Sequence, residues 1–184
     1  MATSADTAAQ VWGGTWRMPT KAEFESLIAN TNYTWETNFN DSGVNGGKFT
    51  DKTDSSKYVF FAAAGDYSSE SLVGDRISSY LWSSTPDGNN AYYVLFYNGV
   101  TEIRSDSRRY GNSVRGVLDG VTTTVEHKVD KYATKKELGS NIVANGHEYV
   151  DLDLPSGTLW ATMNVGATKP TEAGGYYVYG NGAN

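Results

Sequence analysis

Tyr80-Leu-Trp-Ser-Ser-Thr-Pro-Asp-Gly-Asn-Asn-Ala-Tyr-Tyr-Val-Leu-Phe-Tyr-Asn-Gly-Val100 is the stretch with the strongest strand and turn signals in the chain. Its first six residues, 80–85, predict a short strand that stops at the turn sequence 86–90. Residues 91–97 form a second predicted strand, and Asn98-Gly99 is the dipeptide most typical of a two-residue hairpin turn. The stretch therefore predicts an antiparallel hairpin whose return strand is 100–104.

The strand 91–97 places its side chains alternately on two faces. Tyr92, Val94 and Phe96 share one face, and Tyr93, Leu95 and Tyr97 share the other. A Tyr/Leu/Tyr stripe on a solvated strand would be an exposed apolar patch, which usually indicates contact with a partner. The alternative is that this second face packs under a loop, and alternation by itself favours neither arrangement.

One helix is well signalled. Thr20 and Glu23 form a capping box, so the helix should begin at about Lys21 and end at Ala29 or Asn30.

The other predicted elements are short strands separated by polar, glycine-rich segments. We expect a buried strand at 58–65 and further strands at 113–118, 147–154, 158–166 and 176–180. We expect a hairpin or ordered loop at 38–57 and loop structure at 66–79.

Composition excludes several classes of function. The 184 residues suit one domain, and the absence of Cys excludes disulfides and thiol chemistry. Two His cannot supply a three-His metal site, and a net charge of −6 without a basic run disfavours nucleic-acid binding. No apolar stretch is long enough to cross a membrane as a helix, so we expect no membrane insertion. No cofactor motif is found: the acidic turn 51–54 lacks the ligand spacing of a calcium loop.

Four stretches resemble a known family. Gly146 to Thr168 (GHEYVDLDLPSGTLWATMNVGAT) is similar to the opening of a C-type-lectin-like domain of gut bacteria and phages. Trp12 to Phe24 (WGGTWRMPTKAEF) is similar to the middle of that domain, and 80–85 and 108–115 are similar to its end. In relatives, the final third is the variable region of target proteins of diversity-generating retroelements. Those relatives are receptor-binding proteins of phage tails or bacterial surfaces.

The order of the stretches is reversed relative to the family. We therefore expect an α+β, C-type-lectin-like fold that is circularly permuted: 1–118 supplies the middle and end of the domain, 119–145 is a linker, and 146–184 supplies its beginning. The polar linker carries a second capping box, which predicts a short helix that ends at Gly139. The rival arrangement is a swapped homo-oligomer. Closure within a monomer is favoured because a linker that reaches gives a high effective concentration.

The resemblance also implies where a ligand would bind. Positions like Val94 and Phe96 are scaffold in relatives, whereas positions like Tyr93 vary, which implies that the Tyr93 face points outward. Arg108 and Arg115 match framework positions, where Arg ties loops together by hydrogen bonds. The implied ligand-binding residues are Tyr80, Asp87, Asn89, Asn90, Tyr93, Leu95, Tyr97, Arg104, Asp106, Arg109 and Asn112.

The function implied is recognition, with a cell-surface protein or glycan as partner, outside the cell on a bacterial surface or a phage virion. Tyr, Arg, Asn and Asp are the side chains that adaptable binding surfaces use. The alternative from another class is a structural module of a fimbria or tail fibre without a ligand of its own. Lectin-like folds also host enzymes of the formylglycine-generating type, but that activity needs a Cys pair, so we expect no enzyme.

Overall fold

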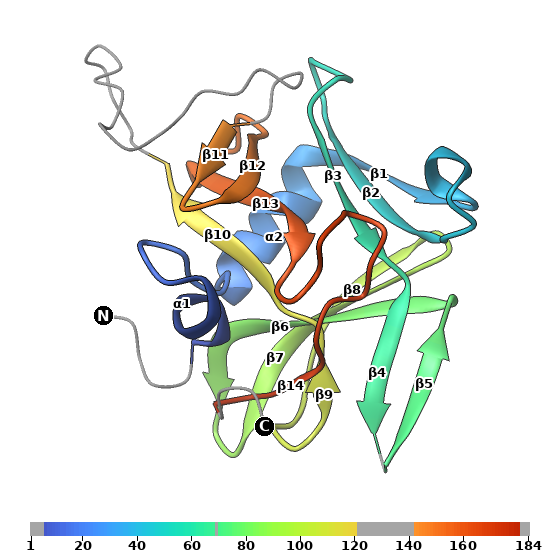
Figure 1. Ribbon diagram of the computed structural model, residues 1–184, viewed down its shortest axis with the longest axis vertical. Coiled ribbons are helices and arrows are strands. Elements are labelled where there is room, and N and C mark those ends of the chain that lie inside the picture. The colour runs from blue at the N-terminus through green and yellow to red at the C-terminus, as the bar shows by residue number, and fades with distance from the viewer. Residues whose placement is uncertain (1–5, 69, 121–141, 181–184) are drawn as a thin grey trace.

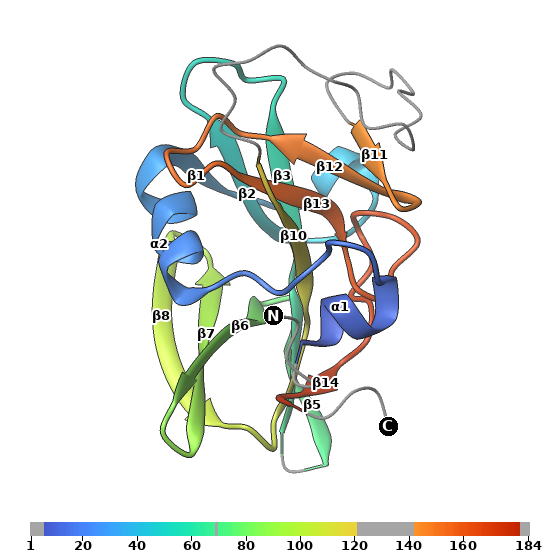
Figure 2. The same cartoon turned by 90° about the vertical axis from the view of Figure 1, so that its left-hand side faces the viewer.

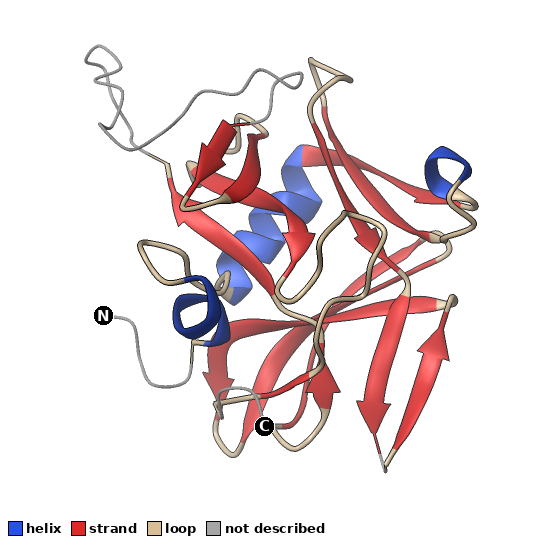
Figure 3. Ribbon diagram, in the orientation of Figure 1, coloured by secondary structure: helices blue, strands red, loops and turns tan. Residues whose placement is uncertain are grey.

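A computed structural model describes residues 6–68, 70–120 and 142–180 of the chain. These residues form mainly β-structure with two α-helices, so the α+β class expected from the sequence is confirmed (Figure 3). The helices are α1 (Thr7–Trp12), α2 (Lys21–Asn30) and the 3-10 turn η1 (Phe39–Asp41). The strands are β1 (Thr31–Glu36), β2 (Gly46–Asp51), β3 (Tyr58–Ala62), β4 (Ala64–Ser68), β5 (Ser71–Asp75), β6 (Ser78–Asp87), β7 (Asn90–Tyr97), β8 (Val100–Ser107), β9 (Gly111–Asn112), β10 (Arg115–Asp119), β11 (Ile142–Ala144), β12 (His147–Asp151), β13 (Thr158–Asn164) and β14 (Tyr177–Val178).

The strands are arranged in three sheets. The largest has seven strands in the order β14-β9-β4-β6-β7-β8, with β5 added at the side of β4, and lies mainly in the lower half of Figure 1. A three-stranded sheet, β1-β2-β3, and a four-stranded sheet, β10-β13-β12-β11, lie above it. Helix α2 lies beside the strands of all three sheets (Figure 2).

Helix α2 begins as the capping box predicts. The Thr20 side chain accepts a hydrogen bond from the backbone N–H of Glu23, and the Glu23 carboxylate accepts one from the backbone N–H of Thr20. The buried side of the helix carries Phe24 and Leu27, which pack into the core. The helix ends at Asn30, within the range predicted from the sequence.

The Glu23 carboxylate also joins three separate parts of the chain. It accepts two hydrogen bonds from Arg17, at 2.6 and 2.8 Å, and one from the Thr158 hydroxyl on β13, at 2.7 Å. Arg17 forms a second ion pair with Asp119 at the end of β10. Burial raises the pKa of Glu23, but the hydrogen bonds from Arg17, Thr20 and Thr158 outweigh burial and hold that pKa at about 2.

Early and late parts of the chain share one sheet. Strand β10 pairs antiparallel with β13. The fully buried Arg115 of β10 donates hydrogen bonds to the Asn164 side chain and to the carbonyl oxygens of Ala161 and Phe60. Its guanidinium also lies 4.4 Å from the Phe61 ring centroid. Burial lowers the pKa of Arg115 to about 9, so the side chain stays charged at neutral pH. The framework role predicted for Arg115 is therefore confirmed.

The predicted linker falls mostly outside the described residues, and so does the helix expected to end at Gly139. Its two ends are ordered as strands: Asp119 is the last residue of β10, and 142–144 is β11, which pairs with β12.

The segment 66–79 differs from its predicted loop structure. Most of it forms the β4–β5 hairpin and the start of β6. The reason is that β5 buries none of its five residues, so it carries no alternating apolar pattern to signal a strand. The predicted strand 58–65 is also divided. It leaves one sheet as β3 and enters another as β4, with Ala63 between them.

Other departures concern the extent of elements. In the predicted loop or hairpin region 38–57, η1 is followed by β2, which pairs with β3. The strand expected at 176–180 is only two residues long, and the sequence gives no indication of α1 or β1.

Candidate recognition surface

The register of β6, β7 and β8 gathers one set of side chains on one face of the large sheet. Tyr80 of β6, Leu95 of β7 and Glu102 of β8 lie directly opposite one another. Tyr93 lies opposite Arg104 in the next row. Residues opposite each other on paired strands point to the same side of the sheet. We call this side the tyrosine face, and it carries Tyr80, Tyr93, Leu95, Tyr97, Glu102, Arg104 and Asp106.

The two faces of β7 divide as alternation predicts. Val94 and Phe96 lie in one hydrophobic cluster with Phe24 of α2 and Phe49 of β2. Tyr93 and the rest of the tyrosine face lie against a different cluster. The scaffold role expected for Val94 and Phe96 is therefore confirmed.

The expected exposure of the tyrosine face is wrong at two positions. Tyr93 is 7% exposed and Leu95 is 5% exposed, and both belong to a hydrophobic cluster that includes Trp82. The Tyr93 ring lies 5.8 Å from the Tyr80 ring and 5.9 Å from the Trp82 ring. Tyr97, by contrast, is half-buried, in the intermediate position between core and surface.

A late segment of the chain closes this face at the Trp82 end. The Trp82 indole N–H donates to the carbonyl oxygen of Tyr177, at 2.8 Å. The Tyr179 ring lies 5.6 Å from the Trp82 ring, and the Tyr179 hydroxyl donates to the carbonyl oxygen of Ser84. The alternative that this face packs under a loop is thus closer to the structure at the Trp82 end, where β14 and Tyr179 lie against the indole. Residues 177–179 lie at least 80 positions after the end of β7, so no local pattern reveals the cover.

The prediction that Asn112 lies on the binding surface is also wrong. It is 2% exposed and lies on β9, where it pairs with Tyr177 of β14. Its side chain is in the interior and cannot contribute to a surface.

A charged edge borders the buried centre of the tyrosine face. Arg104 on β8 is exposed, forms an ion pair with Glu102 and lies opposite Tyr93 of β7. The hydrogen bond with Glu102 raises the pKa of Arg104, and burial raises the pKa of Tyr93. Asp106 follows on the same strand and lies opposite Ala91. Glu102 is not among the ligand-binding residues implied by the sequence, although alternation along β8 places its side chain on the same face as Arg104.

Two turns continue this edge. The β6–β7 turn carries Asp87, Asn89 and Asn90, and the turn after β8 carries Arg109. They lie side by side at the bottom of Figure 1.

Arg108 holds the two turns together. Its guanidinium donates to the carbonyl oxygen of Asn90 at 3.0 Å and to that of Gly88 at 2.8 Å. It also lies over the Tyr179 ring, 5.1 Å from the centroid. The predicted role of Arg108 as a residue that ties loops together is confirmed.

The structure thus separates the predicted site residues into an accessible group and a buried group. Four of the accessible residues, Tyr80, Tyr97, Arg104 and Asp106, lie on the tyrosine face, whereas Asn90 pairs with Ser107 one row beyond Asp106 and belongs with the turns at that end of β7. The accessible group is Tyr80, Asp87, Asn89, Asn90, Tyr97, Arg104, Asp106 and Arg109. The buried group is Tyr93, Leu95 and Asn112.

Within the described ranges, no three His, Asp or Glu side chains gather in a way that could hold a metal ion. His147 stacks on Trp12 with ring centroids 4.0 Å apart, and burial lowers its pKa. Across the part of the chain that is described, no helix has the length and apolar character needed to span a membrane.

Comparison with protein-family models, with curated proteins and with solved structures finds no match to this chain.

Proposed function

We propose that this protein is a ligand-binding module whose recognition surface is the strip formed by the edge of the tyrosine face and the two adjacent turns. One observation carries the proposal: the register of β6–β8 brings Tyr80, Tyr97, Arg104 and Asp106 onto one face, and Arg108 holds together the two turns at the end of the same strands, which carry Asp87, Asn89, Asn90 and Arg109. The buried centre of the face acts as a rigid base for that strip.

The side chains of the strip suit recognition. Tyr80 and Tyr97 are half-buried, so each offers contact area with little rotational freedom left to lose on binding. Arg104 is exposed beside them, and Arg with Tyr is the commonest pair of side chains in binding hot spots. The two turns carry both hydrogen-bond acceptors and donors: Asp87 accepts, Arg109 donates and Asn89 does both. At this end of the strip they can set specificity.

The scaffold that we propose is a circularly permuted C-type-lectin-like domain of the phage-tail or bacterial-surface kind. Support comes from the sequence resemblance and from one structural feature. The stretches that resemble the end and the beginning of that domain supply β10 and β13, which pair in one sheet. A permuted chain needs those two stretches to lie together, and the linker would connect them within a monomer.

The ligand class that we propose is a protein or glycan on a cell surface. Half-buried tyrosines can stack on sugar rings or pack against protein side chains, and the mixed charges of Arg104 and Asp106 favour a polar partner. A structural module of a fimbria or tail fibre is the second candidate, and the exposed β4–β5 hairpin described below favours it because assembly needs contact between chains.

The proposal is tested by binding of the fluorescently labelled protein to a glycan array and to intact bacterial cells. The variants Tyr97→Ala and Arg104→Glu remove contact area and reverse a charge within the strip. Val11→Ala and Lys169→Glu are control variants, because both residues are exposed and lie outside the strip and outside the β4–β5 hairpin.

We expect the two strip variants to lose binding by at least tenfold while their melting temperatures and the binding of the control variants stay unchanged. Absence of any binding by the wild-type protein, or equal losses in the control variants, would overturn the proposal and favour the structural module.

A further inference from the structure

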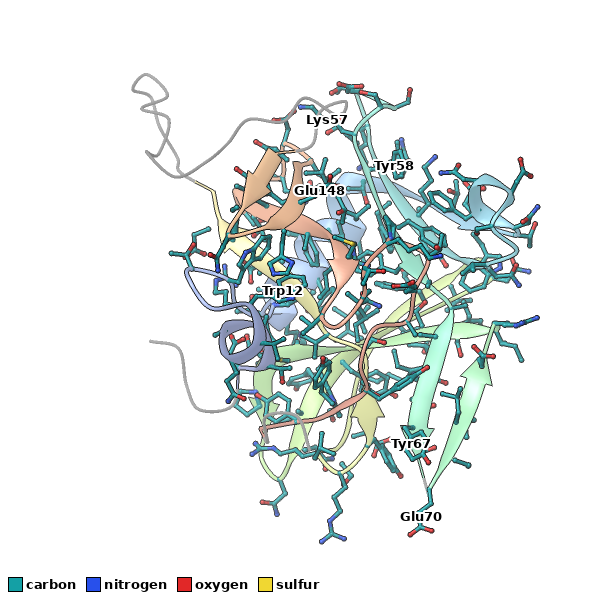
Figure 4. The ribbon with its side chains drawn as sticks, in the orientation of Figure 1. Trp12, Lys57, Tyr58, Tyr67, Glu70 and Glu148 are labelled. Carbon is teal, nitrogen blue, oxygen red and sulfur yellow. The ribbon has the colours of Figure 1, made fainter. Side chains whose placement is uncertain are left out.

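The exposed large hydrophobic side chains of the described residues gather on one hairpin. Tyr67 is 47% exposed, Leu72 44%, Val73 47% and Ile77 68%, and the one other such residue, Val11, lies on α1. All four belong to the β4–β5 hairpin or to the turn that follows it. Figure 4 shows Tyr67 and Glu70 at the lower right, toward the free tip of this hairpin. A concentration of exposed apolar side chains of this kind marks a contact surface.

Strand β5 is also an open edge of the sheet. Within the described residues it pairs only with β4, with Ser71 opposite Ser68 and Val73 opposite Asp66. The hydrogen-bonding groups of successive residues point to opposite sides of a strand, so those of Leu72 point away from β4. Residues 71–75 contain no Lys or Pro, the residues that usually block an edge from pairing with another chain.

We propose that β5 pairs with β5 of a second copy of this chain, antiparallel and about a twofold axis at Val73, to form a homodimer. In this register Val73 meets Val73 of the second copy. Leu72 lies opposite Gly74 of the second copy, which has no side chain and leaves room for the Leu72 side chain; Gly74 has a positive φ of 74°, so the regular ladder ends there.

Charge complementarity selects a second copy as the occupant. Glu70 and Arg76 are exposed, and each lies three residues from Val73, on opposite sides. Both residues lie in the turns that flank β5 and have positive φ, 67° and 62°, so they stand outside the strand ladder. The twofold axis brings the turn that carries Glu70 of each copy beside the turn that carries Arg76 of the other, where the opposite charges attract. A parallel arrangement would place Glu70 against Glu70. Arg76 Nε lies 3.9 Å from the Asp75 carboxylate of its own chain, a weak contact that leaves the guanidinium accessible.

The association should be weak. The Gly74 carbonyl oxygen already accepts hydrogen bonds from Ile77 N–H, at 3.0 Å, and from the Ser78 hydroxyl, at 3.3 Å. The new ladder is therefore short, and apolar and charged contacts supply most of the interaction. A contact of this size is small beside a permanent dimer interface, so we expect a dissociation constant on the order of 10–100 μM.

The test is sedimentation equilibrium of the full chain at protein concentrations from about 5 to about 500 μM, which bracket the expected dissociation constant. The wild type should show a concentration-dependent rise from monomer to dimer mass. Val73→Lys should remain monomeric, whereas Val11→Lys, at a site with the same 47% exposure, should dimerise like the wild type.

A charge exchange tests the register. Glu70→Arg and Arg76→Glu should each weaken dimerisation at least threefold at low salt, and the double variant should recover most of that loss. A wild type that stays monomeric throughout, an equal effect of Val11→Lys, or a double variant weaker than both single variants would overturn the proposal. A dimer insensitive to Val73→Lys would also overturn it and would point to exchange of segments between chains. The inference is independent of the proposed recognition strip, whose binding is measured separately.

Discussion

The β6–β8 region and the β4–β5 hairpin belong to the same sheet but differ in what covers them. The β6–β8 region has a hydrophobic cluster with α2 and β2 on one face, and residues 177–179 close one end of the other. The hairpin has neighbours only along its edge, and every residue of β5 is at least partly exposed. As a result Leu95 is 5% exposed and Leu72 is 44% exposed, although both lie on antiparallel strands. Exposure in this fold is therefore set by layers added from distant parts of the chain.

The largest expected effect is on the covered side of this comparison. Phe96 is fully buried and packs against Phe49, Phe61 and Tyr33. Phe96→Ala should lower the free energy of unfolding by about 3–5 kcal/mol, because it removes a core ring and leaves a cavity. Urea denaturation followed by tryptophan fluorescence measures the change. A loss below about 1 kcal/mol would mean that this face of β7 is not a packed core.

Leu95→Ala sharpens the comparison at the tyrosine face. Because Leu95 is buried, we expect a loss of about 2–3 kcal/mol, whereas an exposed leucine at the same position would cost at most about 0.5 kcal/mol. Leu72→Ala on the hairpin is the matched control and should change stability little, in the monomer at low concentration. Equally small losses of stability for both variants would mean that Leu95 is exposed, as the sequence predicts.

The same contrast applies to charged side chains: a buried carboxylate such as Glu23 contributes more to the loss of stability at low pH than an exposed one such as Asp153. The pKa of Glu23 is about 2 in the folded protein, below its ordinary value of 4.5. Its contribution is therefore complete above about pH 4.5 and is lost as the pH falls toward 2, with a total of roughly 2–3 kcal/mol. Denaturation between pH 2 and 6 should show this loss, and Glu23→Gln should flatten it. Asp153, which pairs with Lys57 and is largely exposed, is the control: Asp153→Asn should leave the acid profile nearly unchanged.

The smallest effect on stability is expected in the exposed β4–β5 hairpin. Val73→Lys should change the free energy of unfolding of the monomer by no more than about 0.5 kcal/mol, since Val73 contacts few neighbours. Thermal unfolding at low protein concentration measures it. A large loss would show that the hairpin is covered in the monomer, and would remove the basis for its pairing with a second copy.

Local signals in the sequence predicted those elements that depend on local interactions. The capping box at Thr20 and Glu23 correctly placed α2, and the Asn98-Gly99 dipeptide correctly placed the turn between β7 and β8. Alternation correctly divided the faces of β7.

Alternation does not reveal which face a distant segment covers, and this is why Tyr93 and Leu95 were placed on the surface. Part of the cover comes from residues 177–179, which lie against Trp82 beside Tyr93 and are held by the pairing of β14 with β9. Asn112 was misplaced for the same reason. The sequence does not reveal the β4–β5 hairpin because β5 buries none of its five residues and therefore carries no alternating apolar pattern.

The buried Arg115 has a consequence for the order in which the protein is completed. One of its hydrogen-bond acceptors, the Phe60 carbonyl, precedes it in the chain, but the Ala161 carbonyl and the Asn164 side chain are made 46 and 49 residues later. During synthesis, the Arg115 guanidinium stays in contact with water until β13 has left the ribosome, because earlier burial would leave its N–H donors without acceptors. The central packing can therefore close only as a late event, and a ribosome that stalls before residue 158 would release a chain exposing its aromatic core to chaperones and proteases.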